Sequence, residues 1–376
     1  MAHIRPRLMT AVLAKELKFW PVVCLLGPRQ VGKSTLLREL LLGPDQGTYK
    51  TLDVAADRLR AESNPEMYIE QVTAWPLVID EAHKSPAIFD EIKASVDRAR
   101  RPGKFILSGS VRFSGKVGIR ESLTGRAAIL RLDTMTLAET TSTKIDLAVV
   151  RKYLEKGGMP GVCFLRDPPT IESYWSQWLD TVCERDLYQL GKGRLSSALA
   201  RMIMEHVALL DVPTVANLAK EIRVDARRIT SHIEALKDLF VLRELTPDKH
   251  GVGKSILLPF DCGLASFLGS PVRRLWQIWF MNECINKKRF SGVANPRTMR
   301  YYLTTRQSFV DFVDEAGFHL FSDQATPGRS ELMTMRALRK KIGPKPKLYI
   351  HCATNSGKHQ VEENMFAVPW SFLVNH

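Results

Sequence analysis

The chain has 376 residues, of which 45% are hydrophobic and 25% charged, a balance that excludes disordered and fibrous proteins. Its net charge is +14, and half of this excess falls in residues 261–376, which hold 16 basic and 9 acidic side chains. A basic surface attracts polyanions, so the charge alone leaves open whether the partner is nucleic acid, anionic lipid or neither.

Export and membrane signals are absent from the sequence. No apolar run reaches the roughly 18 residues that a bilayer crossing needs, and charges interrupt the N-terminal segment MAHIRPRLMTAVLAKEL. The six cysteines are scattered without a paired motif, which predicts reduced thiols rather than disulfides or a zinc ribbon. The nine histidines form no ligand pattern. We therefore expect a cytoplasmic protein with no membrane partner and no zinc.

Strands and helices alternate along the first 140 residues. Apolar runs at 22–27, 75–80 and 104–110 predict buried strands, and helical patterns lie between them. This alternation is typical of a parallel sheet covered by helices on both faces. We predict an α/β fold for this part of the chain.

The first predicted strand leads into a phosphate-binding loop. Residues 27–34, GPRQVGKS, fit the pattern G-x-x-x-x-G-K-[ST] at every fixed position. In such a loop the backbone amides surround a phosphate, the lysine reaches the β- and γ-oxygens, and the serine hydroxyl ligates Mg²⁺. The residues expected to hold ATP are Gly27, Pro28, Arg29, Gln30, Val31, Gly32, Lys33, Ser34 and Thr35.

An acidic pair ends the second predicted strand. Asp80 is expected to hold Mg²⁺ together with Ser34, and Glu81 is expected to polarise the water that attacks the γ-phosphate. DEAH at 80–83 also occurs in a class of helicases, but the other motifs of that class are missing from this sequence. Next to the phosphate-binding loop, a catalytic acidic pair is the better interpretation.

Polar residues follow the third predicted strand. Ser108 and Ser110 could orient the attacking water or only form a turn. Arginines follow at positions 112, 120, 126 and 131. Phosphoryl transfer benefits from an arginine that neutralises transition-state charge, often donated by a neighbouring subunit. Arg126 is the first candidate for this catalytic role, and an arginine acting in trans predicts a homo-oligomer such as a hexameric ring.

Several segments carry a family resemblance. They are GPRQVGKSTLL, LVIDEAHK, FILSGS, ESLTGRAAILRL and GGMPG, with YWSQWLDTVCERDL, ILLPFDCGL and YYLTTRQSFVDFV farther along the chain. They resemble the bacterial and archaeal AAA+ ATPases whose P-loop domain is followed by a DUF4143-type C-terminal region.

The resemblance implies an AAA+ ATPase that uses ATP with Mg²⁺, followed by a winged helix and an endonuclease-like α+β domain. The expected domains are an AAA+ core over 1–140, a helical lid or linker over 141–200, a winged helix-turn-helix over 201–260 and the endonuclease-like domain over 261–376.

The segment 213–245 has the pattern of a helix-turn-helix. Apolar residues recur at helical spacing in two runs that a turn at 224–225 separates. In such folds the second helix can enter the major groove of DNA while basic side chains contact phosphates. The candidates are Arg223, Arg227, Arg228 and Lys237, and His232 is expected to face outward with them. Acidic neighbours nearly cancel this charge, so a protein-binding module stays open.

The last third of the chain carries a denser basic run. Six side chains fall within a dozen residues: Arg336, Arg339, Lys340, Lys341, Lys345 and Lys347. This density favours contact with a DNA backbone over base reading. Asp311 matches the first acid of a metal-dependent nuclease, but the neighbouring strand at 317–324 lacks the required lysine. We expect a nuclease-inactive domain that contacts nucleic acid or another subunit.

Together, the motifs predict an ATP hydrolase that couples hydrolysis to binding and to remodelling or translocation of duplex or branched DNA. The alternative is a nucleotide-gated switch or scaffold that acts on a protein partner without DNA.

Overall fold

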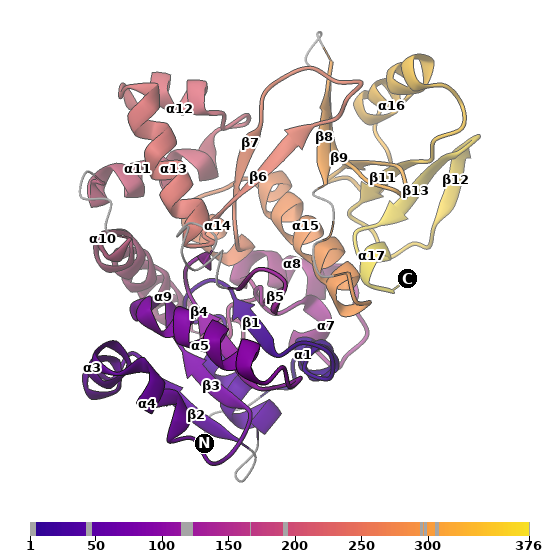
Figure 1. Ribbon diagram of the computed structural model, residues 1–376. Coiled ribbons are helices and arrows are strands. Elements are labelled where there is room, and N and C mark those ends of the chain that lie inside the picture. Colours follow the sequence, from indigo (N-terminus) through magenta and orange to yellow (C-terminus); the bar gives the residue numbers. More distant parts are fainter. Residues whose placement is uncertain are drawn as a thin grey trace. The chain divides into compact units, whose positions relative to one another are not determined.

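A computed structural model of the chain describes residues 5–42, 47–113, 123–165, 167–190, 195–293, 296, 299–304 and 308–375 (Figure 1). The chain divides into two compact units. The first comprises Met1–Met135, Asp238–Phe240 and Asn286–Pro296, and the second comprises Thr136–Lys237, Val241–Ile285 and Arg297–His376. None of the helices in the described ranges combines the length and the apolar character that a membrane crossing requires.

The first unit is built on a five-stranded parallel sheet in the order β2-β3-β4-β1-β5. Its strands are β1 Val22–Leu26, β2 Thr48–Thr51, β3 Leu77–Asp80, β4 Phe105–Gly109 and β5 Ala127–Arg131. The central strand β1 pairs in parallel with β4 and β5 along its whole length. All five of its side chains are buried, as expected for a parallel strand covered on both faces.

Helices cover both faces of this sheet (Figure 1). Alternate side chains of β1 enter opposite apolar clusters: Cys24 packs with the cluster that contains α5 residues, and Leu25 packs with the cluster that contains Leu36. The helices are α1 Met9–Glu16, α2 Lys33–Thr35, the π-helical η1 Leu36–Leu42, α3 Ala55–Ser63, α4 Pro65–Glu70, the 3₁₀ turn η2 Ala82–Lys84 and α5 Ala87–Arg98. The predicted α/β architecture is confirmed.

The second unit opens with helices. They are α7 Leu137–Thr140, α8 Leu147–Lys156, α9 Pro168–Asp180, the π-helical η4 Thr181–Asp186, α10 Leu187–Gln189 and α11 Ser197–Leu209. A helix-turn-helix follows, formed by α12 Val215–Ile222 and α13 Ala226–Asp238. Thr214 caps α12 by accepting a hydrogen bond from the Asn217 amide, and Arg223 ends it in the left-handed conformation. The turn lies where the apolar pattern of the sequence indicates.

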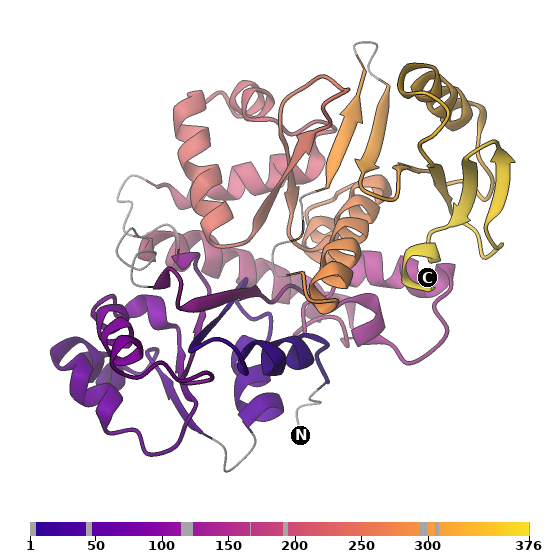
Figure 2. The same cartoon turned by 45° about the vertical axis from the view of Figure 1, so that its right-hand side comes forward.

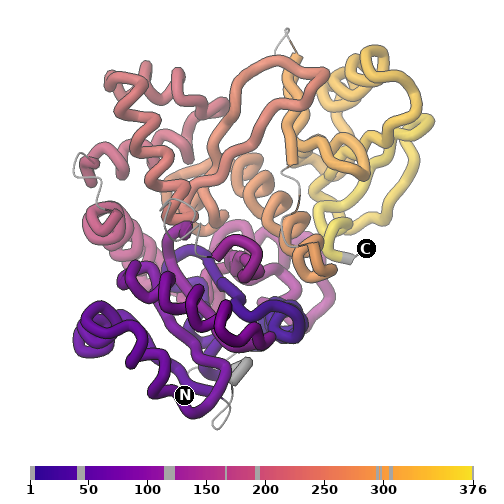
Figure 3. Tube along the Cα trace, in the orientation of Figure 1, coloured from indigo at the N-terminus to yellow at the C-terminus, as the bar shows by residue number. Residues whose placement is uncertain are grey.

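The rest of the second unit is an eight-stranded mixed sheet in the order β12-β13-β11-β10-β9-β8-β6-β7. Its elements are β6 Leu242–Pro247, β7 Ile256–Pro259, α14 Cys262–Phe267, α15 Val272–Phe290, β8 Arg300–Leu303, β9 Phe309–Val313, β10 Phe318–Phe321, α16 Arg329–Ile342, β11 Leu348–Cys352, β12 His359–Glu362, β13 Met365–Pro369 and α17 Phe372–Asn375. Figure 3 traces the chain through these elements, from orange to yellow.

One long helix packs against this sheet. On α15, the Trp276 ring stacks on Phe280, and Phe280 in turn stacks on Phe312 of β9 at a centroid distance of 5.2 Å. Figure 2 shows α15 beside the orange strands β8 and β9. The strands β8, β9 and β10 pair antiparallel, and β10 and β11, which flank α16 in the chain, pair in parallel. The unit therefore has a helical first part and a β-rich last part.

Candidate nucleotide-binding site

The phosphate-binding loop follows β1 at the carboxyl edge of the first sheet. Gln30 and Gly32 adopt left-handed backbone conformations, with φ of 60° and 95°. Gly27 is required for a steric reason, because a Cβ atom there would lie 2.1 Å from the backbone oxygen of Leu132. The loop can therefore pass close to the chain after β5 only because position 27 has no side chain.

Lys33 is folded into this loop. Its side chain is only 5% exposed, and its ammonium group donates hydrogen bonds to the backbone oxygens of Gly27, at 3.0 Å, and Pro28, at 2.8 Å. Lys33 also begins α2, so its charge lies where helix amides and a positive dipole end meet. The loop thus presents a buried cation and backbone donors, which are suited to a phosphate group.

The Asp80 carboxylate accepts hydrogen bonds from the P-loop helix and from residues of the neighbouring strands. Its side chain is buried, with 4% exposure of the residue, and Oδ2 accepts hydrogen bonds of 2.6 Å from the hydroxyls of Ser34 and Tyr49. Oδ1 accepts from the hydroxyl of Ser108 and from the amide of Glu81. The carboxylate is thus held by residues from the P-loop helix and from the ends of β2, β3 and β4. Burial and this carboxylate raise the pKa of Tyr49, which keeps its hydroxyl protonated as a donor.

The oxygen atoms of Ser34 and Asp80 suit magnesium. Hydroxyl and carboxylate oxygens are hard donors, and Mg²⁺ in proteins commonly uses one or two of them together with phosphate and water. No group of three or more histidine, cysteine or acidic side chains is placed to hold a metal within the described residues. The hydroxyl of Ser34 and the carboxylate of Asp80 fit a magnesium ion that also binds the phosphates of a nucleotide.

Glu81 lies next to Asp80 but has different partners. Its backbone is left-handed, with φ of 54°, and its Oε2 accepts hydrogen bonds from the amide and hydroxyl of Ser110, at 3.1 and 3.0 Å. The Nδ1 atom of His83 lies 3.3 Å from the same oxygen. Ser108 and Ser110 therefore bind the two carboxylates, one each, instead of presenting open hydroxyls to water.

Arg126 lies away from these groups. It precedes β5, and its backbone oxygen accepts a hydrogen bond from the Val22 amide at the start of β1. The P-loop follows the opposite end of β1, five residues or about 16 Å along the strand. The guanidinium of Arg126 forms two hydrogen bonds of 2.7 Å with Asp97. The structure thus does not bring Arg126 to the P-loop of its own chain.

Two other arginines lie at the carboxyl edge. Arg131 ends β5 opposite Leu26, the residue before the P-loop, and Arg112 follows β4. Their guanidinium carbons lie 4.9 and 5.6 Å from the ring centre of Phe240. Phe240 belongs to the first unit although it comes much later in the sequence. Motif spacing could not rank these arginines, because the order of strands in the sheet decides which edge each one reaches. The remaining candidate, Arg120, lies outside the described residues.

The buried residue Asp133 is connected to the P-loop by hydrogen bonds through Arg7. Asp133 accepts hydrogen bonds from Arg131, at 2.9 Å, and from Arg289 at the end of α15. Its backbone oxygen accepts from Arg7, at 2.8 Å, and Arg7 also donates to the Val31 oxygen within the P-loop, at 2.9 Å. Sequence reasoning missed this network and Tyr49, because neither belongs to a motif and the partners are up to 156 positions apart.

The predicted DNA contacts on the helix-turn-helix separate into two groups. Arg223, Arg227 and Arg228 are exposed. Lys237 instead pairs with Glu234, at 3.0 Å, and Glu244, at 2.6 Å. His232, expected to face outward, is buried: its Nε2 accepts from the Ser196 amide and its Nδ1 lies 2.7 Å from the Arg228 oxygen. The outward expectation for His232 was wrong, because its position shares the apolar face of α13.

The basic run of the tail divides in the same way. Arg336 and Arg339 both pair with Glu362 of β12, at 2.7 and 3.2 Å. The remaining four members of the run are exposed: Lys340, Lys341, Lys345 and Lys347. These four lysines, unlike the two arginines, combine solvent access with the absence of an acidic partner among the described residues, and Arg336 is exposed as well but paired.

Asp311 is engaged by protein groups. On the buried side of β9, it accepts hydrogen bonds from Arg273, from the side-chain amide of Gln277 and from the Phe321 amide. Both carboxylate oxygens are used, and a guanidinium neutralises the charge. Asp311 is therefore engaged within the protein, and the absence of nuclease activity in this part of the chain stays a prediction.

Comparison with known proteins identifies part of the chain. A family model described as an AAA domain matches residues 20–141, and a model described as a domain of unknown function, DUF8612, matches residues 148–260. Residues 20–141 therefore match an AAA domain, in agreement with the phosphate-binding loop at 27–34. The expected DUF4143-type C-terminal region is not confirmed, because the model that matches there describes a different domain.

Whole proteins that are similar to this chain match it over only part of its length. The chain is 31% identical over 255 residues to the uncharacterized protein Rv2008c of Mycobacterium tuberculosis and to Mb2031c of Mycobacterium bovis. Each match covers 67% of this chain and 55% of the relative, so the chain spans about half the length of these curated relatives. The Walker-type ATPase PABY2304 of Pyrococcus abyssi is 15% identical, with a TM-score of 0.45, over 69% of this chain and 94% of that one.

Proposed function

We propose that the first unit binds ATP with Mg²⁺ and hydrolyses it. The observation that carries this proposal is the Asp80 carboxylate, which Ser34 of the P-loop helix and Ser108 of β4 hold at one point of the sheet edge. A phosphate-binding loop and a carboxylate suited to magnesium thereby share one hydrogen-bond network. The backbone amides of residues 27–33 and the Lys33 ammonium would bind the triphosphate.

Glu81 is the proposed base for the attacking water. Ser110 fixes its carboxylate through two hydrogen bonds, so the group is oriented before substrate arrives. Glu81 accepts a proton from water as the oxygen bonds to the γ-phosphorus, and the bond to the ADP oxygen breaks. Magnesium, when bound, neutralises charge on the phosphate oxygens.

Two variants test this assignment. Lys33→Ala should weaken ATP binding by about 100-fold, because a charge-assisted contact to phosphate is lost. Glu81→Gln should keep ATP affinity and slow hydrolysis by about 100-fold or more. Equilibrium binding and phosphate release measure the two effects, with Lys18→Ala, an exposed lysine of the same unit, as the control. Unchanged ATP affinity in Lys33→Ala would refute the loop assignment.

We further propose that hydrolysis is coupled to DNA binding and remodelling by the second unit. The exposed arginines Arg223, Arg227 and Arg228 on the helix-turn-helix support this proposal, as do four exposed lysines at and after the end of α16. The alternative is a nucleotide-gated switch on a protein partner. It is favoured by Glu221 and Asp225, which are exposed among those arginines.

A salt titration separates the two functions. DNA binding through phosphates predicts that log affinity falls linearly with log salt, by about 0.9 per contact on B-DNA. Binding to a duplex, a junction and a single strand should be measured from low to physiological salt. No binding to any of them at low salt would defeat the DNA function and favour the protein partner.

A homo-oligomer belongs to the same proposal. Since Arg126 lies at the far edge from the P-loop of its own chain, any catalytic role for it requires the site of a neighbouring copy. Mixing Glu81→Gln with Arg126→Ala should then restore part of the ATPase activity that each variant lacks alone. Full activity of Arg126→Ala by itself would remove this residue from catalysis.

A further inference from the structure

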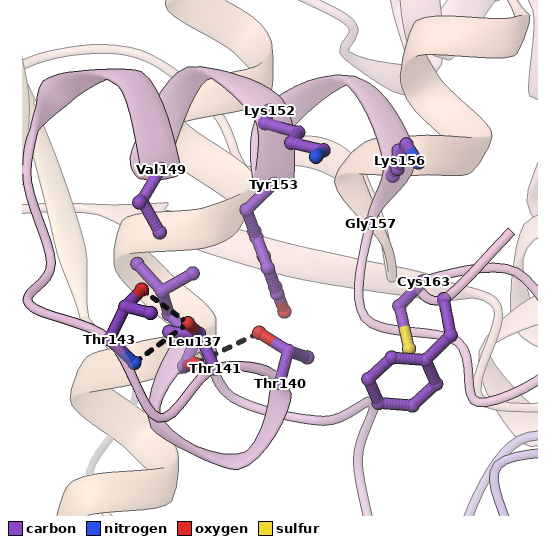
Figure 4. Close-up of a pocket in the computed structure, with 11 residues that line it drawn as sticks. Leu137, Thr140, Thr141, Thr143, Val149, Lys152, Tyr153, Lys156, Gly157 and Cys163 are labelled. Carbon is purple, nitrogen blue, oxygen red and sulfur yellow. Dashed lines mark hydrogen bonds between the residues drawn. The ribbon is translucent and has the colours of Figure 1, made fainter. Parts of the chain in front are cut away.

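A cavity of about 320 Å³ in the second unit is lined by α7, α8 and the following turn (Figure 4). Its threonine hydroxyls are already used, because Thr140 donates to the Leu137 oxygen, and Thr141 and Thr143 bond to each other at 2.8 Å. These bonds are local, so the hydroxyls show no need for a ligand. A tyrosine hydroxyl in the first unit has the opposite arrangement, since its partner is the carboxylate of the nucleotide site.

This tyrosine is Tyr49 of the edge strand β2. Its hydroxyl donates to Oδ2 of Asp80 at 2.6 Å, the same oxygen and the same distance as the bond from Ser34. Tyr49 comes two residues before Thr51, which is the register partner of Asp80 in β3. Because side chains two positions apart share a face of a sheet, Tyr49 and Asp80 lie on one face. The phenol therefore reaches from β2 to the carboxyl end of β3.

The ring of Tyr49 is held as well. The guanidinium carbon of Arg38 lies 4.4 Å from the ring centre, within the range of a cation–π contact. Arg38 comes four residues after Ser34, about one helical turn. The helical segment after the P-loop thus contacts the ring of Tyr49 through Arg38, and through Ser34 it contacts the oxygen that the phenol binds.

The two oxygens of Asp80 are held by different kinds of group. Oδ1 accepts from the hydroxyl of Ser108 and from the amide of Glu81. Oδ2 accepts from Tyr49 and from Ser34, and Ser34 is exposed and is the proposed magnesium ligand. Among the described residues, Tyr49 is therefore the donor that fixes Oδ2 without being a proposed ligand itself.

The position of Oδ2 decides how Ser34 is oriented. A hydroxyl that ligates a metal uses an oxygen lone pair, so its proton has to be donated to another acceptor. Oδ2 of Asp80 is that acceptor for Ser34. Removing a group that orients metal ligands in this way typically lowers metal affinity or activity by about 10- to 100-fold.

We propose that Tyr49 is a positioning residue for magnesium, whose hydroxyl fixes Oδ2 of Asp80 and thereby the direction of the Ser34 hydroxyl. The role rests on the proposed binding of ATP with Mg²⁺ and adds to it a strand that carries no motif. The phenol serves as a hydrogen-bond donor, so Tyr49 acts through Asp80 and is not a ligand.

Tyr68 offers a close control in the same unit. The ammonium of Lys50 lies 4.0 Å from its ring centre, so this tyrosine also has a cation over its ring. Its hydroxyl is buried and has no hydrogen-bond partner among the described residues. Tyr68→Phe therefore removes a buried hydroxyl but no hydrogen bond, whereas Tyr49→Phe removes the bond to Asp80 and keeps the ring.

The first test measures binding of a non-hydrolysable ATP analogue to the full chain by calorimetry, once with excess Mg²⁺ and once with EDTA. Tyr49→Phe should leave the affinity in EDTA unchanged and reduce the gain that Mg²⁺ gives by about 10-fold. Arg38→Met keeps the hydroxyl and removes the cation, so it should reduce this gain by only about 3-fold. Tyr68→Phe should change neither affinity.

The second test titrates Mg²⁺ in steady-state hydrolysis. Tyr49→Phe should raise the half-saturating concentration by about 10-fold and leave kcat at saturating Mg²⁺ unchanged. A lower kcat with an unchanged magnesium requirement would reduce Tyr49 to a support of the fold and overturn the proposal. A magnesium gain in nucleotide affinity that Tyr49→Phe does not diminish would overturn this role and leave the ATPase standing. A wild-type chain whose nucleotide affinity does not respond to Mg²⁺ would overturn the magnesium site, and this role with it.

Discussion

At the scale of single residues, the two acidic side chains at the sheet edge have separate supports. Asp80 accepts the Ser108 hydroxyl, and Glu81 accepts the Ser110 hydroxyl and amide. Removing one serine should therefore disturb one carboxylate and leave the other in place. This separation allows metal binding and water activation to be tested independently.

Ser108→Ala should raise the Mg²⁺ concentration needed for half-maximal ATPase activity, because Asp80 loses a buried donor. Ser110→Ala should leave that concentration unchanged and lower kcat by about 10-fold, because Glu81 keeps only the backbone amide. Magnesium titrations of steady-state hydrolysis distinguish the two, and each variant serves as the control for the other. An equal effect of both serines on the magnesium requirement would contradict separate roles.

Several residues of the site could be predicted from the sequence, and others could not. Ser34 and Asp80 stand at motif positions next to strand ends, so their hydrogen bond follows from the parallel sheet. Tyr49 bonds to Asp80 from β2, a half-buried strand with no motif. Arg126 was the first candidate among the arginines that follow the third predicted strand, and the sequence does not tell at which edge of the sheet each of them lies. Side-chain roles that depend on the order of strands in the sheet therefore could not be predicted from the sequence.

At the scale of elements, the P-loop and the chain after β5 approach closely at one point. A methyl group at Gly27 would overlap the Leu132 backbone oxygen, and the two segments cannot separate without disturbing the pairing of β1 with β5. Gly27→Ala should lower the opening free energy of β1 by about 3 kcal/mol or more. Hydrogen exchange of peptides from β1 and β4 measures this loss.

Gly125→Ala is the matched control in the same unit. Position 125 has a positive φ, of 73°, which Gly27 does not share, but a Cβ atom there would meet nothing within 4 Å. The control should cost only about 1 kcal/mol, the backbone strain by itself. A loss of only about 1 kcal/mol or less in Gly27→Ala, no larger than in the control, would contradict a severe overlap at Gly27.

A buried glutamate makes α15 sensitive to pH. Glu283 accepts hydrogen bonds from the Leu137 amide, at 2.6 Å, and from the indole of Trp279, at 3.1 Å. Burial, aided by the charge of Glu139, raises the pKa of Glu283 to about 7. The folded chain therefore holds this proton more tightly than the unfolded chain, and stability is lost as pH rises from about 4.5 through 7.

Glu283→Gln should stabilise α15 against opening at pH 8 by up to about 3 kcal/mol, because it removes the buried charge. At pH 5 the gain should nearly vanish, since the wild-type side chain is then protonated. Hydrogen exchange of α15 peptides at the two pH values measures the difference, with the exposed Glu363→Gln as the control. A gain that is the same at both pH values would place the effect elsewhere than in titration.

The helical spacing of apolar residues predicted the turn of the helix-turn-helix but not the burial of His232. The turn between α12 and α13 was predicted from the apolar spacing, yet the same spacing puts His232 beside Ile229 and Ile233 on the inner face. The polar character of histidine concealed this signal. The strand β2 gave almost no sequence signal, because its four residues are all partly exposed and its pairing with β3 depends on chain about 30 positions away.

At the scale of the whole molecule, the second unit combines parts that the sequence separates. A domain boundary was expected near residue 260, between the helix-turn-helix and the tail. In the structure, β6 pairs antiparallel with β7 and in parallel with β8, through Thr246 and Arg300. One sheet therefore continues across the expected boundary. Pairing between strands more than 50 positions apart leaves no local pattern, so composition and breaker residues could not indicate it.

The net charge of +14 also acts at this scale, and it raises the question of whether the proposed DNA binding would depend on total charge or on local contacts. Arg336 and Arg339 share one carboxylate, Glu362, which offsets one of their two charges, whereas Lys340 and Lys345 are exposed. Charge paired within the protein releases few counterions from DNA, so the exposed lysines should account for most of the salt dependence of this region.

The double variant Lys340→Ala/Lys345→Ala should therefore reduce the log–log salt slope of duplex binding by about 1.8, which corresponds to two lost phosphate contacts. The variant Lys18→Ala/Lys93→Ala removes the same total charge from exposed positions of the first unit and should leave the slope unchanged. Fluorescence anisotropy across a range of salt concentrations measures both slopes. Equal changes in the two double variants would show that the long-range field of the whole molecule, and not contact at the end of α16, attracts the DNA.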